Sequence, residues 1–199
     1  MRARRAPWLL ALLPLCAHAG HGLLNSFSDL QWLPAPGRTP DQWNYRLDWW
    51  QEKSALLLAA DDDARFTLCL EYMREKLAEA EAMVVKSDTE AARVAVKNYR
   101  AYFDRALALT TVVPNEPTAT ARLGLARALL EHQYMLSVDY PDLPVAPRAA
   151  LAALMEFLDK AYTALRAQLP RSAVQALFFK EEEVRWSWEM ARRAGEIPP

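Results

Sequence analysis

The chain has 199 residues, of which 52% are hydrophobic, and its formal net charge at pH 7 is -1. This length and composition fit one folded domain and exclude a disordered chain. Only five glycines are present, whereas Ala, Leu, Glu and Arg are abundant, and no long alternation of apolar and polar residues predicts a strand. The sequence therefore predicts an all-α protein.

The first nineteen residues have the three parts of a secretory signal peptide. Three arginines lie among the first five residues, an apolar stretch covers residues 7–15, and Ala17, His18 and Ala19 form an A-x-A cleavage site. The apolar stretch is shorter than the roughly 20 residues that span a membrane as a helix, and no later segment is comparable. We therefore predict cleavage after Ala19, a soluble periplasmic or secreted protein, and no transmembrane segment in the mature chain.

Cleavage would also change the charge and the cysteine content. It removes three arginines, which leaves 21 basic and 25 acidic residues and a formal charge of -4, so a nucleic-acid partner is not expected. Cys16 leaves with the signal peptide unless residues 13–16 are a lipoprotein site, an alternative that Leu15 disfavours because that motif prefers a small residue before the cysteine. Cys69 would remain alone, as a buried thiol without a disulfide partner.

A segment rich in Pro, Gly and Ser follows the signal peptide, at residues 20–38. Such a composition disfavours a regular helix, but the segment still carries four large apolar side chains: Phe27, Leu30, Trp32 and Leu33. We therefore predict an irregular arm that lies across a single helical domain formed by residues 39–199.

The helical domain begins with a capping box. Thr39 is a suitable N-cap, Pro40 suits the first helical position, and Gln42 follows Thr39 by three residues. We therefore expect a helix over residues 40–58. Its helical spacing predicts one buried stripe and two acidic residues that face solvent: the stripe is Trp43, Leu47, Trp50, Ser54 and Leu57, and the acidic residues are Asp48 and Glu52.

The stretch at residues 61–84 is the expected axis of the domain. Asp61, Asp62 and Asp63 start it, and we interpret them as an N-cap and first turn rather than a metal site, because no second ligand cluster follows. Apolar residues recur at steps of three and four, which predicts a buried face: Phe66, Cys69, Leu70, Met73, Leu77, Ala80 and Val84. The charged residues are expected on a solvated face, with ion pairs between Asp61 and Arg65 and between Glu71 and Arg74: they are Arg65, Glu71, Arg74, Glu75, Lys76 and Glu79.

Four more helices follow after short connections. A second capping box at residues 87–90 starts a helix that ends near Thr110, and another helix follows over residues 117–137. Two further helices start at Pro147 and at the capping box of Ser172. Helical spacing predicts the buried sides of the third and fifth helices: Ala92, Val96, Tyr99, Phe103 and Ala106 or Leu107, and Leu151, Leu154, Leu158, Tyr162 and Leu165. Because short connections favour antiparallel neighbours, the sequence predicts a bundle of six mostly antiparallel helices.

Three motifs in the first three predicted helices resemble a known bacterial family. They are YRLDWWQEK at residues 45–53, REKLAEA at residues 74–80 and YRAY at residues 99–102. The first of them is aromatic and charged, and a short acidic turn follows it. Over residues 45–107 the chain is similar to a family of exported helical domains of unknown function, DUF5667. The resemblance implies a helical, extracytoplasmic module. It implies no activity and no site residues, because the family has none assigned.

Histidines are too few for most catalytic groupings. After cleavage only His21 and His132 remain, and a nucleophilic Ser or Cys needs a nearby base. His132 lies among apolar residues, which favours a structural role. The alternatives are a b-type haem held by His132 and a methionine, and loose copper binding at a free Gly20-His21 terminus. We therefore expect no enzyme and no cofactor, with a haem- or metal-binding bundle as the alternative.

The sixth predicted helix is too apolar for one buried face. Phe179 and Trp186 fall on a different side from its expected core stripe. We favour the interpretation that these two residues are covered within the body, for example by the arm. The alternative is that they form a surface for a partner. The core stripe itself is expected to contain Val174, Leu177, Phe178, Val184 and Trp188.

The acidic residues of the chain suggest no catalytic pair, because Glu71, Glu75 and Glu79 alternate with bases and are expected to form an ordinary ionised surface. The sequence thus predicts an exported periplasmic binding or scaffolding module with no catalytic activity of its own, whose partner is another envelope protein. An envelope-stress or chaperone-like protein is a further alternative, although the repeated Leu-Thr-x-x-Gln motif of such proteins is absent.

Overall fold

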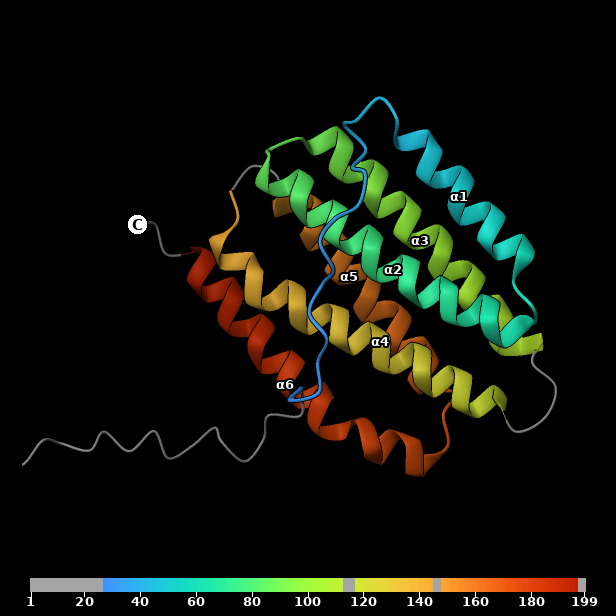
Figure 1. Ribbon diagram of the computed structural model, residues 1–199. Coiled ribbons are helices and arrows are strands. Elements are labelled where there is room, and N and C mark those ends of the chain that lie inside the picture. Colours follow the sequence, from blue (N-terminus) through green and yellow to red (C-terminus); the bar gives the residue numbers. More distant parts are fainter. Residues whose placement is uncertain (1–26, 113–116, 145–147, 197–199) are drawn as a thin grey trace, which may run out of the picture.

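The computed structural model describes residues 27–112, 117–144 and 148–196. These residues contain six α-helices, one 3-10 helix and no strand, which confirms the predicted all-α fold (Figure 1). The helices are α1 (Tyr45–Leu58), α2 (Asp62–Val85), α3 (Thr89–Val112), α4 (Pro117–Asp139), α5 (Arg148–Arg166) and α6 (Arg171–Glu196), with η1 (Tyr140–Asp142) after α4. The predicted signal peptide at residues 1–19, with Cys16, and His21 lie outside the described residues. In the described part of the chain, no helix combines the length and the apolar character needed to cross a membrane.

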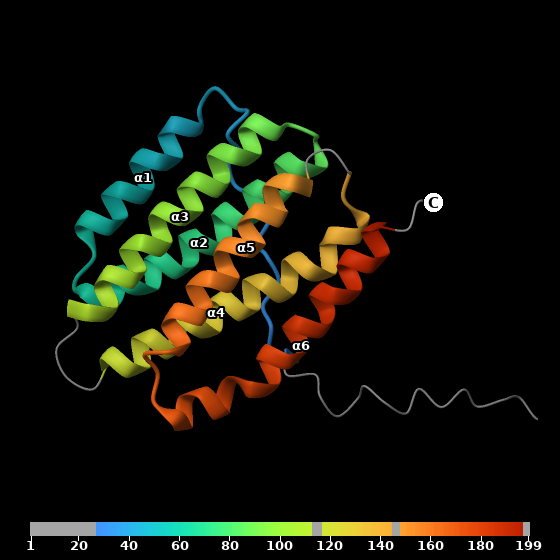
Figure 2. The ribbon, with the colours of Figure 1, turned by 180° about the vertical axis from the view of Figure 1, so that it is seen from behind.

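Helices that follow one another in the chain run antiparallel, as predicted (Figures 1 and 2). The centre of the bundle is the long pair α2 and α3, and α4 packs against both. Helices α5 and α6 each pack on α4, whereas α1 packs on α2 at the edge of the bundle. The buried side chains form one continuous core cluster that extends from Phe27 to Val184.

The apolar stripes of α3 and α5 are buried as predicted, and so is that of α2, except that Leu70 is only partly buried. The predicted solvated face of α2 is wrong in the middle of the helix, because Lys76 and Glu79 are also buried. The reason is the position of α2, which packs against α1, α3, α4 and α5 and so has no side left for solvent there.

The first two helices begin differently. Asp61 caps α2 as predicted, since its Oδ1 accepts a hydrogen bond from the backbone N–H of Ala64 at 2.8 Å. Thr39 does not cap a helix, because its hydroxyl donates to Asp41 Oδ1 at 2.5 Å. Residues 40–44 therefore form turns, and α1 begins at Tyr45 rather than at residue 40.

A tight turn joins α2 to α3. Ser87 has a φ of 60°, and the N–H groups of Ser87 and Asp88 donate to the carbonyl oxygens of Val84 and Met83, each at 2.9 Å. This is the Schellman pattern that ends many helices. Asp88 then caps α3 by accepting from the N–H of Ala91 at 3.0 Å, so the cap lies one residue later than the predicted capping box.

The described part of the arm lies across α4 and α2, as predicted (Figure 1). Phe27 is buried and stacks on Tyr134 of α4, with the ring centroids 4.3 Å apart. Arg74 of α2 donates to the carbonyl oxygens of Gln31 and Trp32, each at 2.8 Å. Arg74 therefore binds the arm instead of forming the predicted pair with a neighbouring glutamate of α2.

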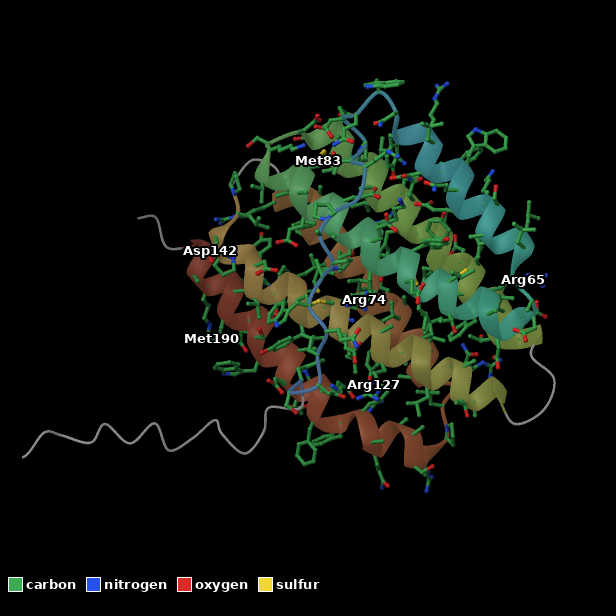
Figure 3. The ribbon with its side chains drawn as sticks, in the orientation of Figure 1. Arg65, Arg74, Met83, Arg127, Asp142 and Met190 are labelled. Carbon is green, nitrogen blue, oxygen red and sulfur yellow. The ribbon has the colours of Figure 1, made fainter. Side chains whose placement is uncertain are left out.

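Ion pairs at the start of the arm add to this attachment. Asp29 pairs with Arg127 of α4 at 2.5 Å and with Lys180 of α6 at 3.2 Å. Figure 3 shows Arg74 and Arg127 along the path of the arm. The arm thus ties α2, α4 and α6 together on one face of the bundle.

Candidate functional site

Helix α1 lies on the bundle with its polar side inward, the reverse of the predicted orientation. The exposed fraction is 92% at Trp43 and 81% at Leu57. Glu52, predicted to face solvent, is only 5% exposed. Asp48 is largely enclosed as well, and it pairs with Arg38 of the arm. Every residue of the predicted buried stripe is in fact exposed: Trp43, Leu47, Trp50, Ser54 and Leu57.

The cause is a buried ionic cluster beneath α1, here named the clasp: Tyr45, Glu52, Lys76, Glu79, Asn98 and Tyr102. Lys76 Nζ pairs with Glu52 Oε1 of α1 and, at 2.6 Å, with Glu79 Oε1 of α2 itself. A buried ammonium group without such partners is destabilising by several kcal/mol. Because α2 keeps Lys76 in the interior, α1 is held with Glu52 turned toward it.

Hydroxyl groups complete the clasp. The Tyr102 hydroxyl of α3 donates to Glu52 Oε2, and the Tyr45 hydroxyl donates to Glu79 Oε2 at 2.9 Å. Asn98 of α3 donates to the Tyr45 hydroxyl at 2.8 Å. Glu52 Oε2 and both oxygens of Glu79 therefore accept hydrogen bonds, while Glu52 Oε1 faces the Lys76 ammonium as an ion pair, and the network joins α1, α2 and α3.

The electrostatics of the clasp follow from burial and from these partners. Burial acts to lower the pKa of Lys76, but Glu79 and Glu52 outweigh it and hold that pKa above its ordinary value. Burial raises the pKa of Glu79 to about 7, although Lys76 and Tyr45 pull it down. Burial also raises the pKa of Tyr45 and of Tyr102, so both remain neutral donors. Since Lys76 and Glu79 are closed to solvent, the clasp attaches α1 and has no access for a substrate.

Sequence reasoning missed the clasp, although α1 carries a signal for it. Tyr45, Asp48 and Glu52 recur at steps of three and four, so they form a second stripe opposite the aromatic one. On α2, Lys76 and Glu79 interrupt an otherwise apolar run at the same spacing. Two polar stripes on neighbouring helices are the pattern that a buried ionic contact leaves in a sequence.

The opposite side of α1 carries Leu47, Trp50, Leu57 and Leu58, and Trp43 lies in the turn just before the helix. These five exposed residues are here named the outward face. Trp49 lies edge-on to Trp50, with ring centroids 5.3 Å apart, and Lys53 Nζ lies 3.5 Å from the centroid of the Trp49 ring. Large apolar side chains gathered in this way on a surface are typical of interaction sites.

A groove of about 550 Å³ lies beside the outward face, between α1, α2 and α3. Its lining is mainly apolar, and Cys69 is buried at its inner surface. Burial raises the pKa of the Cys69 thiol, as expected for a cysteine that acts as a small hydrophobe. Arg65 lines the groove and pairs with Asp62 at 2.6 Å, not with Asp61 as predicted. Figure 3 shows Arg65 at the end of α2 that follows α1.

The predicted partner surface on α6 is exposed. The exposed fractions are 56% at Phe179 and 54% at Trp186, and Phe178, predicted for the core, is 49% exposed. The favoured prediction that the helix is covered on two sides is therefore wrong. The described part of the arm contacts α6 at Lys180 and then runs across α4 and α2.

His132 has a structural environment. It is buried, and its Nδ1 lies 2.7 Å from the Tyr99 hydroxyl. Burial lowers the pKa of His132 to about 3, so the ring is neutral and accepts a hydrogen bond from Tyr99. Over the described ranges, no group of three or more His, Cys, Asp or Glu side chains is placed to hold a metal ion.

Comparison with known proteins gives one match. Residues 37–134 match the model of a family described as a domain of unknown function, DUF5667, and this range includes the resemblance seen at residues 45–107. No curated protein and no solved structure matches the chain. The matched range contains the whole clasp and the outward face of α1. Residues 37–134, which form α1, α2, α3 and most of α4, are therefore a helical domain of the DUF5667 kind.

Proposed function

We propose that this protein is an exported binding module, without catalytic activity of its own, that holds another envelope protein on the outward face of α1. One observation carries the proposal: a helix with two unlike sides is attached by its polar side, so that its tryptophans and leucines face away from the bundle. An isolated domain gains nothing from this orientation, because the hydrophobic effect favours the opposite one.

The outward face has the composition of an interface core. Burying one large apolar side chain stabilises a complex by about 1.5–3 kcal/mol, and aromatic residues are enriched at the centres of interfaces. The clasp supports this use, since it fixes α1 before a partner arrives and so reduces the entropy lost on binding.

Three side chains that could serve catalysis are held inside the described part of the chain. Cys69 is buried, His132 is engaged by Tyr99, and Lys76 is enclosed in the clasp. These contacts support a role in binding.

The export part of the proposal rests on residues 1–19. Protein recovered from a periplasmic extract should have Gly20 as its first residue, as N-terminal sequencing would show. A chain that retains residues 1–19 in the cytoplasm would refute export. A membrane-bound form that begins at Cys16 would establish the lipoprotein alternative.

Site-specific photo-crosslinking in the cells that express the protein tests the partner surface. A crosslinking amino acid at position 50, on the outward face, should give one discrete product, while the same residue at position 160, an exposed site on α5, should give none. A product from position 186 without one from position 50 would place the partner surface on α6 and refute the proposal.

A further inference from the structure

The groove beside the outward face has the dimensions and lining of a small-molecule site. Its volume is about 550 Å³, within the range of roughly 300–1,000 Å³ that is usual for such sites. Leu56 and Leu57 of α1 and Ala108 and Leu109 of α3 give it an apolar lining. The groove is therefore suited to a narrow aliphatic group.

The groove differs from the neighbouring outward face in its charge. Each of the three helices contributes one cation to the lining, namely Lys53 of α1, Arg65 of α2 and Arg105 of α3, and none of the lining residues that the structure describes is acidic. Arg65 is neutralised by Asp62.

Lys53 and Arg105 have a different environment. Over the described ranges 27–112, 117–144 and 148–196, neither of them has a carboxylate within ion-pair distance, in contrast to Arg65. Each lies over an aromatic ring, with Lys53 Nζ 3.5 Å from the centroid of Trp49 and the Arg105 guanidinium carbon 5.8 Å from that of Tyr102. Such cation–π contacts leave the N–H donors available to an anion.

We propose that this groove binds the anion of a long-chain fatty acid, with the carboxylate at Lys53 and Arg105 and the chain along Leu56, Leu57 and Leu109. Charge complementarity selects this occupant, because a carboxylate accepts paired hydrogen bonds from a guanidinium group. A neutral lipid leaves the two cations without a counter-charge, and a small inorganic anion leaves the apolar lining unfilled. The site extends beyond the proposed function and does not depend on it, since Lys53, Arg105 and Leu109 line the groove and do not belong to the outward face.

Titration calorimetry with palmitate, kept below the concentration at which it forms micelles, tests the proposal on the purified full chain. Palmitate should bind with one molecule per chain, at least tenfold more tightly than hexadecan-1-ol or hexadecyltrimethylammonium, and acetate should not bind detectably. Lys53→Gln and Arg105→Gln should each weaken palmitate binding about tenfold, since each removes a charged donor. Arg46→Gln, which removes an exposed cation elsewhere on α1, is the matched control and should bind palmitate as the unaltered chain does.

Three results would overturn the site: no palmitate binding to the unaltered chain, equal binding of the cationic amphiphile, or unchanged affinity in both Lys53→Gln and Arg105→Gln. Ala108→Trp provides a second check, because Ala108 is exposed and a larger side chain there should fill the groove without unfolding the protein. Circular dichroism should show an unchanged fold and calorimetry should show lost binding. The crosslinking result at position 50 is independent of these measurements, so the two proposals can fail separately.

Discussion

Lys76 of α2 and Glu52 of α1 form an ion pair that is closed to solvent on both sides, with side-chain exposed fractions of 1% and 6%. In such a pair the mutual attraction is largely offset by the free energy of removing both charges from water. Its main effect is therefore on specificity, because any arrangement that separates the partners leaves a buried charge alone. The pair determines which side of α1 contacts the bundle.

Glu52→Gln should destabilise the protein by about 3 kcal/mol, because Lys76 then keeps only one carboxylate in a site that is closed to solvent. Urea unfolding at pH 7 would measure the change. Glu71→Gln, at an exposed position of α2, is the matched control and should stay within about 0.5 kcal/mol of the unaltered chain. Equal losses in the two variants would show that the clasp does not hold α1.

Truncation of two aromatic residues should change the free energy of unfolding by very different amounts. Phe27→Ala should lower the free energy of unfolding by about 3 kcal/mol, because Phe27 is 4% exposed and stacked on Tyr134. Trp43→Ala should change it by less than about 0.5 kcal/mol, because that ring faces solvent. Thermal or urea unfolding distinguishes the two. A large loss for Trp43→Ala would mean that this ring packs against the bundle instead of facing solvent.

Glu81 of α2 and Asp139 of α4 form a carboxyl pair beside the arm. Burial raises the pKa of Glu81 to about 7, helped by the charge and hydrogen bond of Asp139, and burial also raises the pKa of Asp139. Lys86 and Trp32 line the same hollow. The folded protein therefore holds a proton here that an unfolded glutamate, with a pKa of about 4.3, has released.

The stabilising contribution of this proton is complete below about pH 4 and is lost as the pH rises to about 7. Glu81→Gln keeps the neutral form at every pH. Between pH 5 and pH 8 its free energy of unfolding should rise relative to that of the unaltered chain by about 1 kcal/mol, a value that allows for partial exposure. Paired denaturation curves at the two pH values measure the difference. A difference independent of pH would contradict the pairing.

His132 should make the protein sensitive to acid. Its folded-state pKa of about 3 lies below the value of about 6.5 for an unfolded histidine, so its contribution is present above pH 6.5 and is lost as the pH falls toward 3. Relative to His132→Gln, the unaltered chain should lose roughly 3 kcal/mol of stability between pH 7 and pH 4. Unfolding curves at both pH values test this, and parallel losses in the two proteins would refute it.

Helices with one apolar side were predictable from sequence. Leu154, Leu158 and Tyr162 of α5 recur at steps of four. When such a helix lies on a bundle with its other side in solvent, this apolar side is the one that is buried. The full buried surface of α2 could not be predicted in this way, because other helices surround α2. Lys76 and Glu79 look like surface residues in the sequence, and only the packing of four other helices around them makes them interior ones.

The spacing within α1 alone could not decide its orientation, and no spacing could predict the groove. A repeat shows that α1 has an aromatic side and a polar side, but which of them contacts the bundle is decided by Lys76 on another helix. Likewise, Lys53 and Arg105 line one groove only because α1 and α3 pack beside the same end of α2. No local sequence pattern predicts that residues so far apart in the chain will line one groove.

Arg74 holds the arm through two backbone carbonyl oxygens, a group that every amino acid supplies, and through the Gln31 side chain, whose Oε1 accepts from Arg74 at 3.2 Å. Two of these three hydrogen bonds do not depend on which side chains stand at positions 31 and 32. Distant relatives could keep the same crossing with arms that no longer resemble one another. In a search for them, the arginine on the helix would be the better marker than any residue of the segment it holds.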